Sequence, residues 1–180
     1  MHKAGFVNII GSPNVGKSTL INAILGEKLV ITNAKAQTTR HRILGMLNAD
    51  NYQLILSDTP GIIQPAYKLQ ESMMDAMQSV FDDADVLIYM VEIGEKKAKV
   101  ESIIQRLAKT DKPLFLVINK IDKGNQTLLE ETIDAWKKQL PNAQIRSISA
   151  LEKFQIEVLV AQMVAPVSYT HLTLPTTTIV

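Results

Sequence analysis

The chain has 180 residues, of which 46% are hydrophobic and 21% charged, so it can bury enough apolar surface to fold, and disorder along its whole length is excluded. Its net charge of +1 argues against a globally basic nucleic-acid coat and against an acidic tail protein. The absence of cysteine excludes a disulfide scaffold, a thiol nucleophile and a cysteine zinc site. No apolar run reaches the roughly 20 residues that a bilayer span needs. We therefore expect a soluble cytoplasmic protein.

The first third of the chain alternates apolar runs with one helical stretch. Residues 5–10 form an apolar run that ends at a glycine, which is typical of a buried strand. Residues 17–25 carry apolar side chains at helical spacing and are followed by glycine, a common helix terminator. Two further runs, 42–47 and 52–56, flank the turn residues 48–51 and predict a hairpin.

The middle and later parts of the chain repeat the alternation of strands and helices. Residues 85–91 and 114–118 are apolar enough to be buried strands. Residues 100–107 and 129–140 carry apolar side chains at the spacing of amphipathic helices. A methionine-rich stretch at 73–80 has the same spacing, and we interpret it as core rather than as a cofactor or partner surface. This order predicts an α/β fold with a mainly parallel sheet covered on both faces and one antiparallel edge strand.

The composition changes near the end of the chain. From about residue 166 threonine dominates, charge disappears and no period fits. We therefore expect one domain over residues 1–165 and a tail over residues 166–180 that does not belong to its pattern. The alternative is a short terminal strand.

A phosphate-binding motif follows the first predicted strand. Residues 11–18 match G-x-x-x-x-G-K-[ST], and the predicted strand before and helix after them favour a phosphate loop over an ordinary glycine-rich turn. The glycines let backbone N–H groups approach phosphate oxygens, and Lys17 is placed to reach the terminal phosphates. The residues expected around the phosphates are Gly11, Ser12, Pro13, Asn14, Val15, Gly16, Lys17, Ser18 and Thr19.

A base-selecting motif, N-K-x-D, follows the buried run 114–118. The Asp122 carboxylate can accept hydrogen bonds from N1–H and the 2-amino group of guanine, a pair of donors that adenine lacks. Asn119 can bridge the purine and the loops, and the stem of Lys120 can lie over the ring. Ser149 and Ala150 would supply a backbone N–H to the guanine oxygen. An ATP-dependent enzyme is the alternative if Asp122 is incidental.

A third motif, Asp58-Thr59-Pro60-Gly61, ends the second strand of the predicted hairpin. Asp58 is placed to hold Mg²⁺ together with the Ser18 hydroxyl, and the Gly61 N–H is placed to sense a γ-phosphate. An ordinary Asp-x-Pro-Gly turn is the alternative when this motif is taken alone. Its order between the two preceding motifs favours the nucleotide site.

A polar loop lies between the first predicted helix and the hairpin. We expect Thr39 to supply a hydroxyl to Mg²⁺, with Thr38 as the alternative, and we expect loss of the γ-phosphate to release this loop. The small basic cluster beside it is interpreted as a solvated or phosphate-steering face rather than as a specific RNA site. Its members are Lys35, Arg40, His41 and Arg42.

The order of these motifs resembles that of the Ras-like GTPases, and the runs 37–42, 58–61 and 67–73 more closely resemble the Era-type family. The similarity covers about residues 3 to 163. It implies a three-layer P-loop NTPase fold with a six-stranded, mainly parallel sheet and about five helices. It also implies a molecular switch that hydrolyses GTP to GDP and phosphate with Mg²⁺ and acts in assembly of the small (30S) ribosomal subunit.

Two residues bear on the mechanism that this resemblance implies. Ile62 stands where many Ras-like proteins have a glutamine that orients the attacking water, so we expect slow turnover without an activator. Asn14 stands where related enzymes use an asparagine to help bind K⁺, which makes K⁺ stimulation a hypothesis for this chain.

The resemblance also sets expectations for partners. Era-type proteins continue into an RNA-binding KH domain with a Gly-x-x-Gly loop, and nothing after Ala165 resembles it. We therefore expect a truncated GTPase domain, and we expect 16S rRNA, the small subunit and peripheral inner-membrane association only for the full-length parent. The alternative is the GTPase domain of a Der-like ribosome GTPase or an MnmE-like tRNA-modification GTPase, against which the run 37–42 argues.

Overall fold

The computed structural model describes residues 2–12, 14–26, 42–58 and 78–168, with side chains described from 45 to 57 in the third range. A single six-stranded sheet has the strand order β2-β3-β1-β4-β5-β6. The strands are β1 (Lys3–Gly11), β2 (Arg42–Asn48), β3 (Tyr52–Asp58), β4 (Val86–Glu92), β5 (Leu114–Asn119) and β6 (Gln144–Ser147). The helices with defined bounds are α1 (Lys17–Leu25), α3 (Glu101–Ala108), α4 (Gln126–Gln139) and α5 (Ile156–Val164).

Local sequence explains where several of these elements begin and end. Helix α4 begins after Asn125, whose side chain accepts a hydrogen bond from the Leu128 N–H at 2.8 Å, and Pro141 follows its end. Helix α1 ends at Gly26, which has a positive φ of 62° and donates its N–H to the Asn22 carbonyl. Strand β5 contains only buried residues, as expected for a central strand of a parallel sheet.

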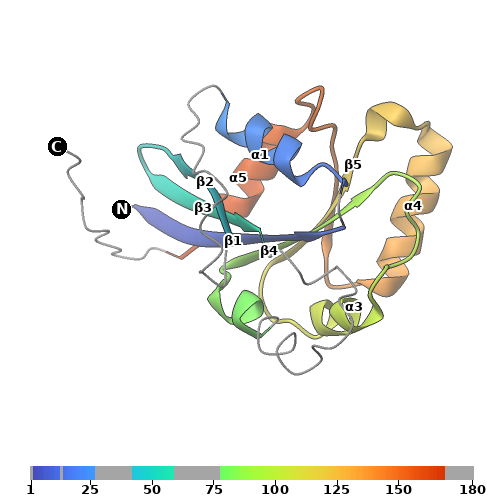
Figure 1. Cartoon of the computed structure of the whole chain (residues 1–180), viewed down its shortest axis with the longest axis horizontal. Helices are drawn as coiled ribbons and strands as arrows, with labels where there is room; N and C mark the ends of the chain where they lie inside the picture. Colours follow the sequence, from blue (N-terminus) through green and yellow to red (C-terminus); the bar gives the residue numbers. More distant parts are fainter. Residues whose placement is uncertain (1, 13, 27–41, 59–77, 169–180) are drawn as a thin grey trace.

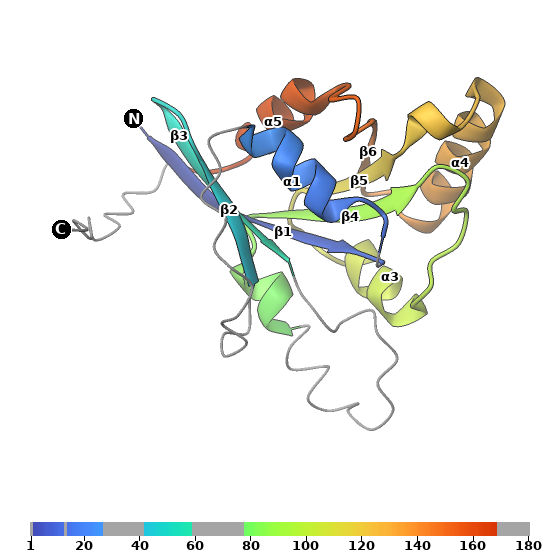
Figure 2. The ribbon, with the colours of Figure 1, turned by 45° about the horizontal axis from the view of Figure 1, so that its top comes forward.

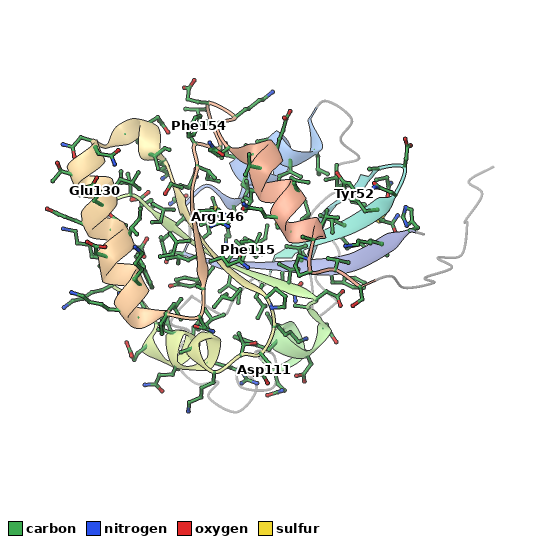
Figure 3. All side chains as sticks on the ribbon, turned by 180° about the vertical axis from the view of Figure 1, so that it is seen from behind. Tyr52, Asp111, Phe115, Glu130, Arg146 and Phe154 are labelled. Atoms are coloured by element: carbon green, nitrogen blue, oxygen red, sulfur yellow. The ribbon has the colours of Figure 1, made fainter. Side chains whose placement is uncertain are left out.

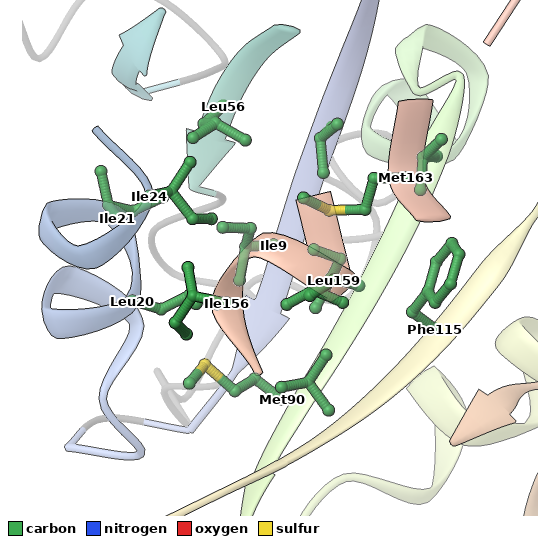
Figure 4. Close-up of a cluster of buried hydrophobic side chains, with 14 of the residues drawn as sticks. Ile9, Leu20, Ile21, Ile24, Leu56, Met90, Phe115, Ile156, Leu159 and Met163 are labelled. Atoms are coloured by element: carbon green, nitrogen blue, oxygen red, sulfur yellow. The ribbon is translucent and has the colours of Figure 1, made fainter. Parts of the chain in front are cut away.

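The sheet is the middle of three layers (Figures 1 and 2). Helices α1 and α5 cover one face, and the helical residues 78–83, α3 and α4 cover the other. Each face of the sheet has its own hydrophobic core. Successive residues of β4 contribute to one core and then the other, because side chains of a strand point to opposite faces in turn. Figure 4 shows the core on the face covered by α1 and α5, where side chains of these helices meet those of β1, β3, β4 and β5.

The topology confirms the predicted fold class. Strand β1 pairs in parallel with β3 and β4, and β5 pairs in parallel with β4 and β6. The edge strand β2 pairs antiparallel with β3, as the hairpin pattern predicts. From β1 the chain goes to the β2–β3 side and then crosses to β4 on the other side. The strand order therefore reverses at β1, and in such sheets ligands bind outside the carboxyl ends of the strands at this point.

The boundary predicted at residue 165 falls two residues short of the packed unit. Val167 is buried in the core under α1 and α5, and its N–H donates to the Val164 carbonyl at 3.2 Å. Its side chain occupies the space over Gly5, where a Cβ would come within 2.7 Å of it. Residues 166 and 167 thus continue the packed chain past the predicted boundary, and the assignment of residues 166–180 as a tail stays a prediction. Residues 169–180 lie outside the part of the chain that the structure describes.

Within the described ranges, no helix combines the length and apolar character needed to cross a membrane.

Candidate functional site

The carboxyl ends of the parallel strands bring the three predicted motifs to one edge of the sheet. Strand register places Gly11 beside Met90 and Glu92 beside Asn119. Asp58 ends β3, one position after Ser57, the partner of Asn8, and lies level with Ile9. The candidate site is therefore assembled by sheet topology from segments far apart in sequence.

The phosphate loop has a backbone that only small or tolerant residues can adopt. Gly16 has a φ of 103°, and a Cβ there would lie 2.3 Å from the Asn119 side-chain nitrogen. A Cβ at Gly11 would lie 2.9 Å from the Met90 carbonyl oxygen. Asn14 also has a left-handed φ, of 66°, which asparagine tolerates better than most residues. Val15 is buried in the core and anchors the loop.

The loop leads directly into the N-terminus of α1. Among the described residues no side chain caps this end, and its first turn contains no acidic residue. Its backbone N–H groups therefore present positive potential to an anion. Lys17 folds over the loop and donates from its Nζ to the Gly11 carbonyl at 2.8 Å. Ser18 and Thr19 are exposed in the first turn.

Asn119 joins the phosphate loop to the base-selecting segments. It is 2% exposed, and its Nδ2 donates to the Val15 carbonyl at 2.9 Å while its Oδ1 accepts from the Ala150 N–H at 2.9 Å. One buried amide thereby satisfies groups from two loops that are 135 residues apart in the chain (150 − 15). A guanine oxygen that accepts from the Ala150 N–H would share this donor with Asn119 Oδ1 or displace that oxygen.

Asp122 and Ser149 form the second link in this corner. The Ser149 hydroxyl donates to Asp122 Oδ1 at 2.6 Å and accepts from the Glu152 N–H at 3.2 Å. The turn after Ser149 is closed by the Phe154 N–H, which donates to the Ser149 carbonyl at 2.9 Å. Figure 3 shows Phe154 beside the start of α5. A carboxylate has about four acceptor positions, so Asp122 keeps capacity for two donors of a base.

Lys120 contacts both halves of the site. Its backbone is left-handed with a φ of 62°, and its Nζ donates to the Asn14 carbonyl and to Glu92 Oε2, each at 2.6 Å. The hydrogen bond from Lys120 holds the pKa of the Glu92 carboxyl below its ordinary value. Glu92 was not among the predicted site residues. Only the register that pairs it with Asn119 places it here, and local sequence does not reveal that register.

A second carboxylate lies behind this corner. Glu95 Oε2 accepts from the Glu92 N–H at 3.4 Å, whereas Glu95 Oε1 is buried without a hydrogen-bond partner among the described residues. Burial raises the pKa of Glu95. Burial, and then the charge of Glu95, also raise the pKa of Tyr89. The Trp136 Nε1 donates to the Glu95 carbonyl at 2.6 Å and ties this loop to α4.

Part of the predicted site lies outside the described residues. This applies to Pro13, Thr38, Thr39, Thr59, Pro60, Gly61 and Ile62, and only the backbone of Asp58 is described. The described donors and acceptors nevertheless suit a purine nucleotide. The two glycines leave a cradle that a Cβ would fill, the uncapped helix end faces it, and an amide and a carboxylate lie beside it.

The fold and this edge of the sheet define the class of the chain as a P-loop GTPase domain. The family model described as "50S ribosome-binding GTPase" matches residues 6–120, and the chain belongs to this family.

Relatives and solved structures extend this result. The chain is 44% identical over 165 residues to GTPase Era of Thermoanaerobacter sp. (strain X514), covering 91% of this chain and 55% of that protein. It is 43% identical to GTPase Era of Clostridium novyi (strain NT), covering 91% and 56%. The chain thus spans about half the length of the curated relatives it matches.

Two crystal structures of Era are similar to the whole described fold. One is Era in complex with MgGDPNP and nucleotides 1506–1542 of 16S ribosomal RNA, with a TM-score of 0.77, 38% identity and coverage of 97% of this chain and 60% of that chain. The other is Aquifex aeolicus Era bound to GDP·AlF4⁻, with a TM-score of 0.76, 38% identity and coverage of 96% and 60%. The expected six-stranded P-loop fold is confirmed by this similarity.

Proposed function

We propose that this chain is the GTP-binding and GTP-hydrolysing domain of an Era-type molecular switch. The observation that carries the proposal is the corner in which Asn119 bonds to Val15 and Ala150 while Ser149 bonds to Asp122. In this proposal the Asp122 carboxylate would accept from the two donors of guanine, and the Ala150 N–H would donate to its oxygen. Adenine would leave the carboxylate without these two donors, so guanine is favoured over adenine.

The phosphates would lie in the cradle between Gly11 and the N-terminus of α1. Lys17 would exchange its bond to the Gly11 carbonyl for the terminal phosphates, and the Gly61 N–H would contact the γ-phosphate. Mg²⁺, when bound, offsets the charge that develops on the phosphates during hydrolysis. The residues proposed to hold it are Ser18, Asp58 and Thr39, with Thr38 as the alternative to the last.

Two features of the loops bear on the rate. Ile62 has no group that orients water, so turnover without an activator is slow in this proposal. Asn14 is proposed to help bind K⁺, and its exposed position in the loop beside the phosphate cradle supports this. Turnover measured in K⁺ and in Na⁺ buffers tests the point, because equal rates contradict it.

The biological role is proposed at the level of the Era-type protein as a whole, since the chain spans 55% of the length of such a relative. We propose action in assembly of the small ribosomal subunit through 16S rRNA, the RNA present in the Era complex. The RNA-binding part is proposed to lie outside the GTPase domain, and the site of action is proposed to be the cytoplasm.

The guanine assignment is tested by Asp122→Asn. This change replaces an acceptor by an amide that presents a donor, so GTP affinity should fall by at least about 100-fold. Xanthosine triphosphate, whose 2-oxo group accepts a hydrogen bond, should bind the variant better than GTP does. Titration of fluorescent nucleotides measures both affinities.

The matched control is Asp134→Asn, the same chemical change on the exposed face of α4. It should leave both affinities as in the parent protein. Unchanged GTP affinity in Asp122→Asn would exclude the proposed guanine site.

A further inference from the structure

Lys120 belongs to the N-K-x-D motif, whereas its ion-pair partner Glu92 belongs to none of the sequence motifs that define the site. Glu92 is the last residue of β4, and it lies level with Asn119, one residue before Lys120. The Lys120 ammonium therefore emerges directly beside the Glu92 carboxylate. Its other bond is to the carbonyl of Asn14 in the phosphate loop. A single side chain thus spans from β4 to the phosphate loop across the base-selecting segment.

The environment of this ion pair distinguishes it from an ordinary surface pair. The Lys120 side chain is 26% exposed and that of Glu92 is 46% exposed, whereas in the surface pair between Lys96 and Glu131 the side chains are 43% and 53% exposed, so the difference lies at the lysine end. Attraction between charges is stronger where water is partly excluded. Lys120 also holds the pKa of Glu92 below its ordinary value, so the carboxylate stays ionised at neutral pH.

The backbone conformation of Lys120 indicates a role for the ion pair. A lysine with a φ of 62° adopts a conformation that L-residues with long side chains rarely occupy, which costs conformational free energy. The two bonds of its ammonium offset this cost and fix the direction of its four-carbon stem. Without the carboxylate, the ammonium would keep only the Asn14 carbonyl as a partner within the described residues.

We propose that Glu92 is a positioning residue for the guanine nucleotide, which holds the Lys120 ammonium against the Asn14 carbonyl and so couples the base-selecting corner to the phosphate loop. The proposal rests on the proposed function. Glu92 itself touches no nucleotide atom in this scheme. It acts through Lys120, whose stem lies along the ring of the base and whose ammonium holds the loop around the phosphates.

The test is a double-mutant cycle on nucleotide dissociation. We would measure the release rate of fluorescent GDP from the full chain and from Glu92→Ala, Lys120→Ala and the double variant. Loss of a partly buried charged hydrogen bond should speed release by about 10-fold in Glu92→Ala. Because Glu92 acts through Lys120, the double variant should release GDP no faster than Lys120→Ala alone. If the increases in release rate caused by the two single changes multiply in the double variant, the proposal is overturned.

Two further variants separate positioning from a general loss of stability. Glu131→Ala breaks the exposed ion pair with Lys96 and should leave the release rate unchanged. Glu92→Gln keeps an acceptor for Lys120 but removes the charge, so its release rate should fall between those of the parent and of Glu92→Ala. A release rate in Glu92→Ala equal to that of the parent would overturn the role of Glu92 and leave GTP binding intact. Failure of the parent chain to bind guanine nucleotide would instead overturn the proposed function.

Discussion

The phosphate loop and the base-selecting corner are adjacent but are built by different means. The loop depends on backbone conformation, with a glycine at φ 103° and a helix end that no side chain caps in the described part of the chain. The corner depends on side-chain hydrogen bonds between distant segments, above all those of Asn119 and Asp122. Backbone N–H groups bind any phosphate, whereas positioned side chains distinguish one base from another. In the proposed function, the loop therefore supplies most of the affinity for the nucleotide and the corner supplies the selectivity for guanine.

Lys17→Ala should have the largest effect on this division of roles between loop and corner. The change removes the charge that faces the phosphates, so GTP affinity should fall by about 100-fold, the worth of strong charged hydrogen bonds. The preference for guanosine over xanthosine nucleotides should remain, because the corner is untouched. Competition titrations with both nucleotides measure this. A loss of preference that accompanies the loss of affinity would show that loop and corner do not act separately.

A change at the junction should affect both regions. Asn119→Ala leaves the buried Val15 carbonyl and Ala150 N–H without their partner, at a cost of about 2–3 kcal/mol in the free energy of unfolding. Affinity and base preference should both fall, because the amide serves both regions. Urea denaturation and nucleotide titration provide the two measurements.

The matched control for this prediction is Asn8→Ala. Asn8 is another buried asparagine, in the middle of β1, whose Nδ2 donates to the Val80 carbonyl at 2.7 Å. Its loss should lower stability to a similar extent and leave the base preference unchanged. A preference lost equally in both variants would attribute the Asn119 effect to stability alone.

The smallest expected effect concerns the carboxylate behind the corner. Burial raises the pKa of Glu95 in the folded state, so folding favours its protonated form, and its contribution to stability falls as pH rises above the ordinary value of 4.5. Glu95→Gln removes this loss, so relative to the parent protein the variant should be more stable at pH 7 than it is at pH 4.5. Urea denaturation of both proteins at the two pH values measures it. An unchanged pH dependence would contradict the assignment.

The fold could be predicted well where one element carries its own pattern. The buried runs of β1, β4 and β5 and the capped helix α4 follow from local apolar periodicity and turn residues. The edge strand β6 is only four residues long and has no fully buried residue, so its sequence carries a weak signal.

The site could be predicted only where a motif is contiguous. Residues of the phosphate loop and of N-K-x-D are local in sequence, and the structure brings those it describes together. Glu92 and Val167 were missed because their roles depend on partners elsewhere. Glu92 needs the register between β4 and β5, and Val167 needs the space that Gly5 leaves in β1. No local period encodes either relation.

The contact between the first strand and the last helix bears on the order in which the protein matures during synthesis. The Lys3 Nζ donates to the carbonyls of Val164 and Ala165 at 3.3 and 3.0 Å, across separations of 161 and 162 residues. The packing of the central strand β1 is therefore complete only after the end of the domain has been synthesised. At typical rates of translation, the phosphate loop emerges on the order of seconds before Ser149 and Ala150. The phosphate loop is therefore synthesised first, but the strand that leads into it completes its packing only after the base-selecting corner has also emerged.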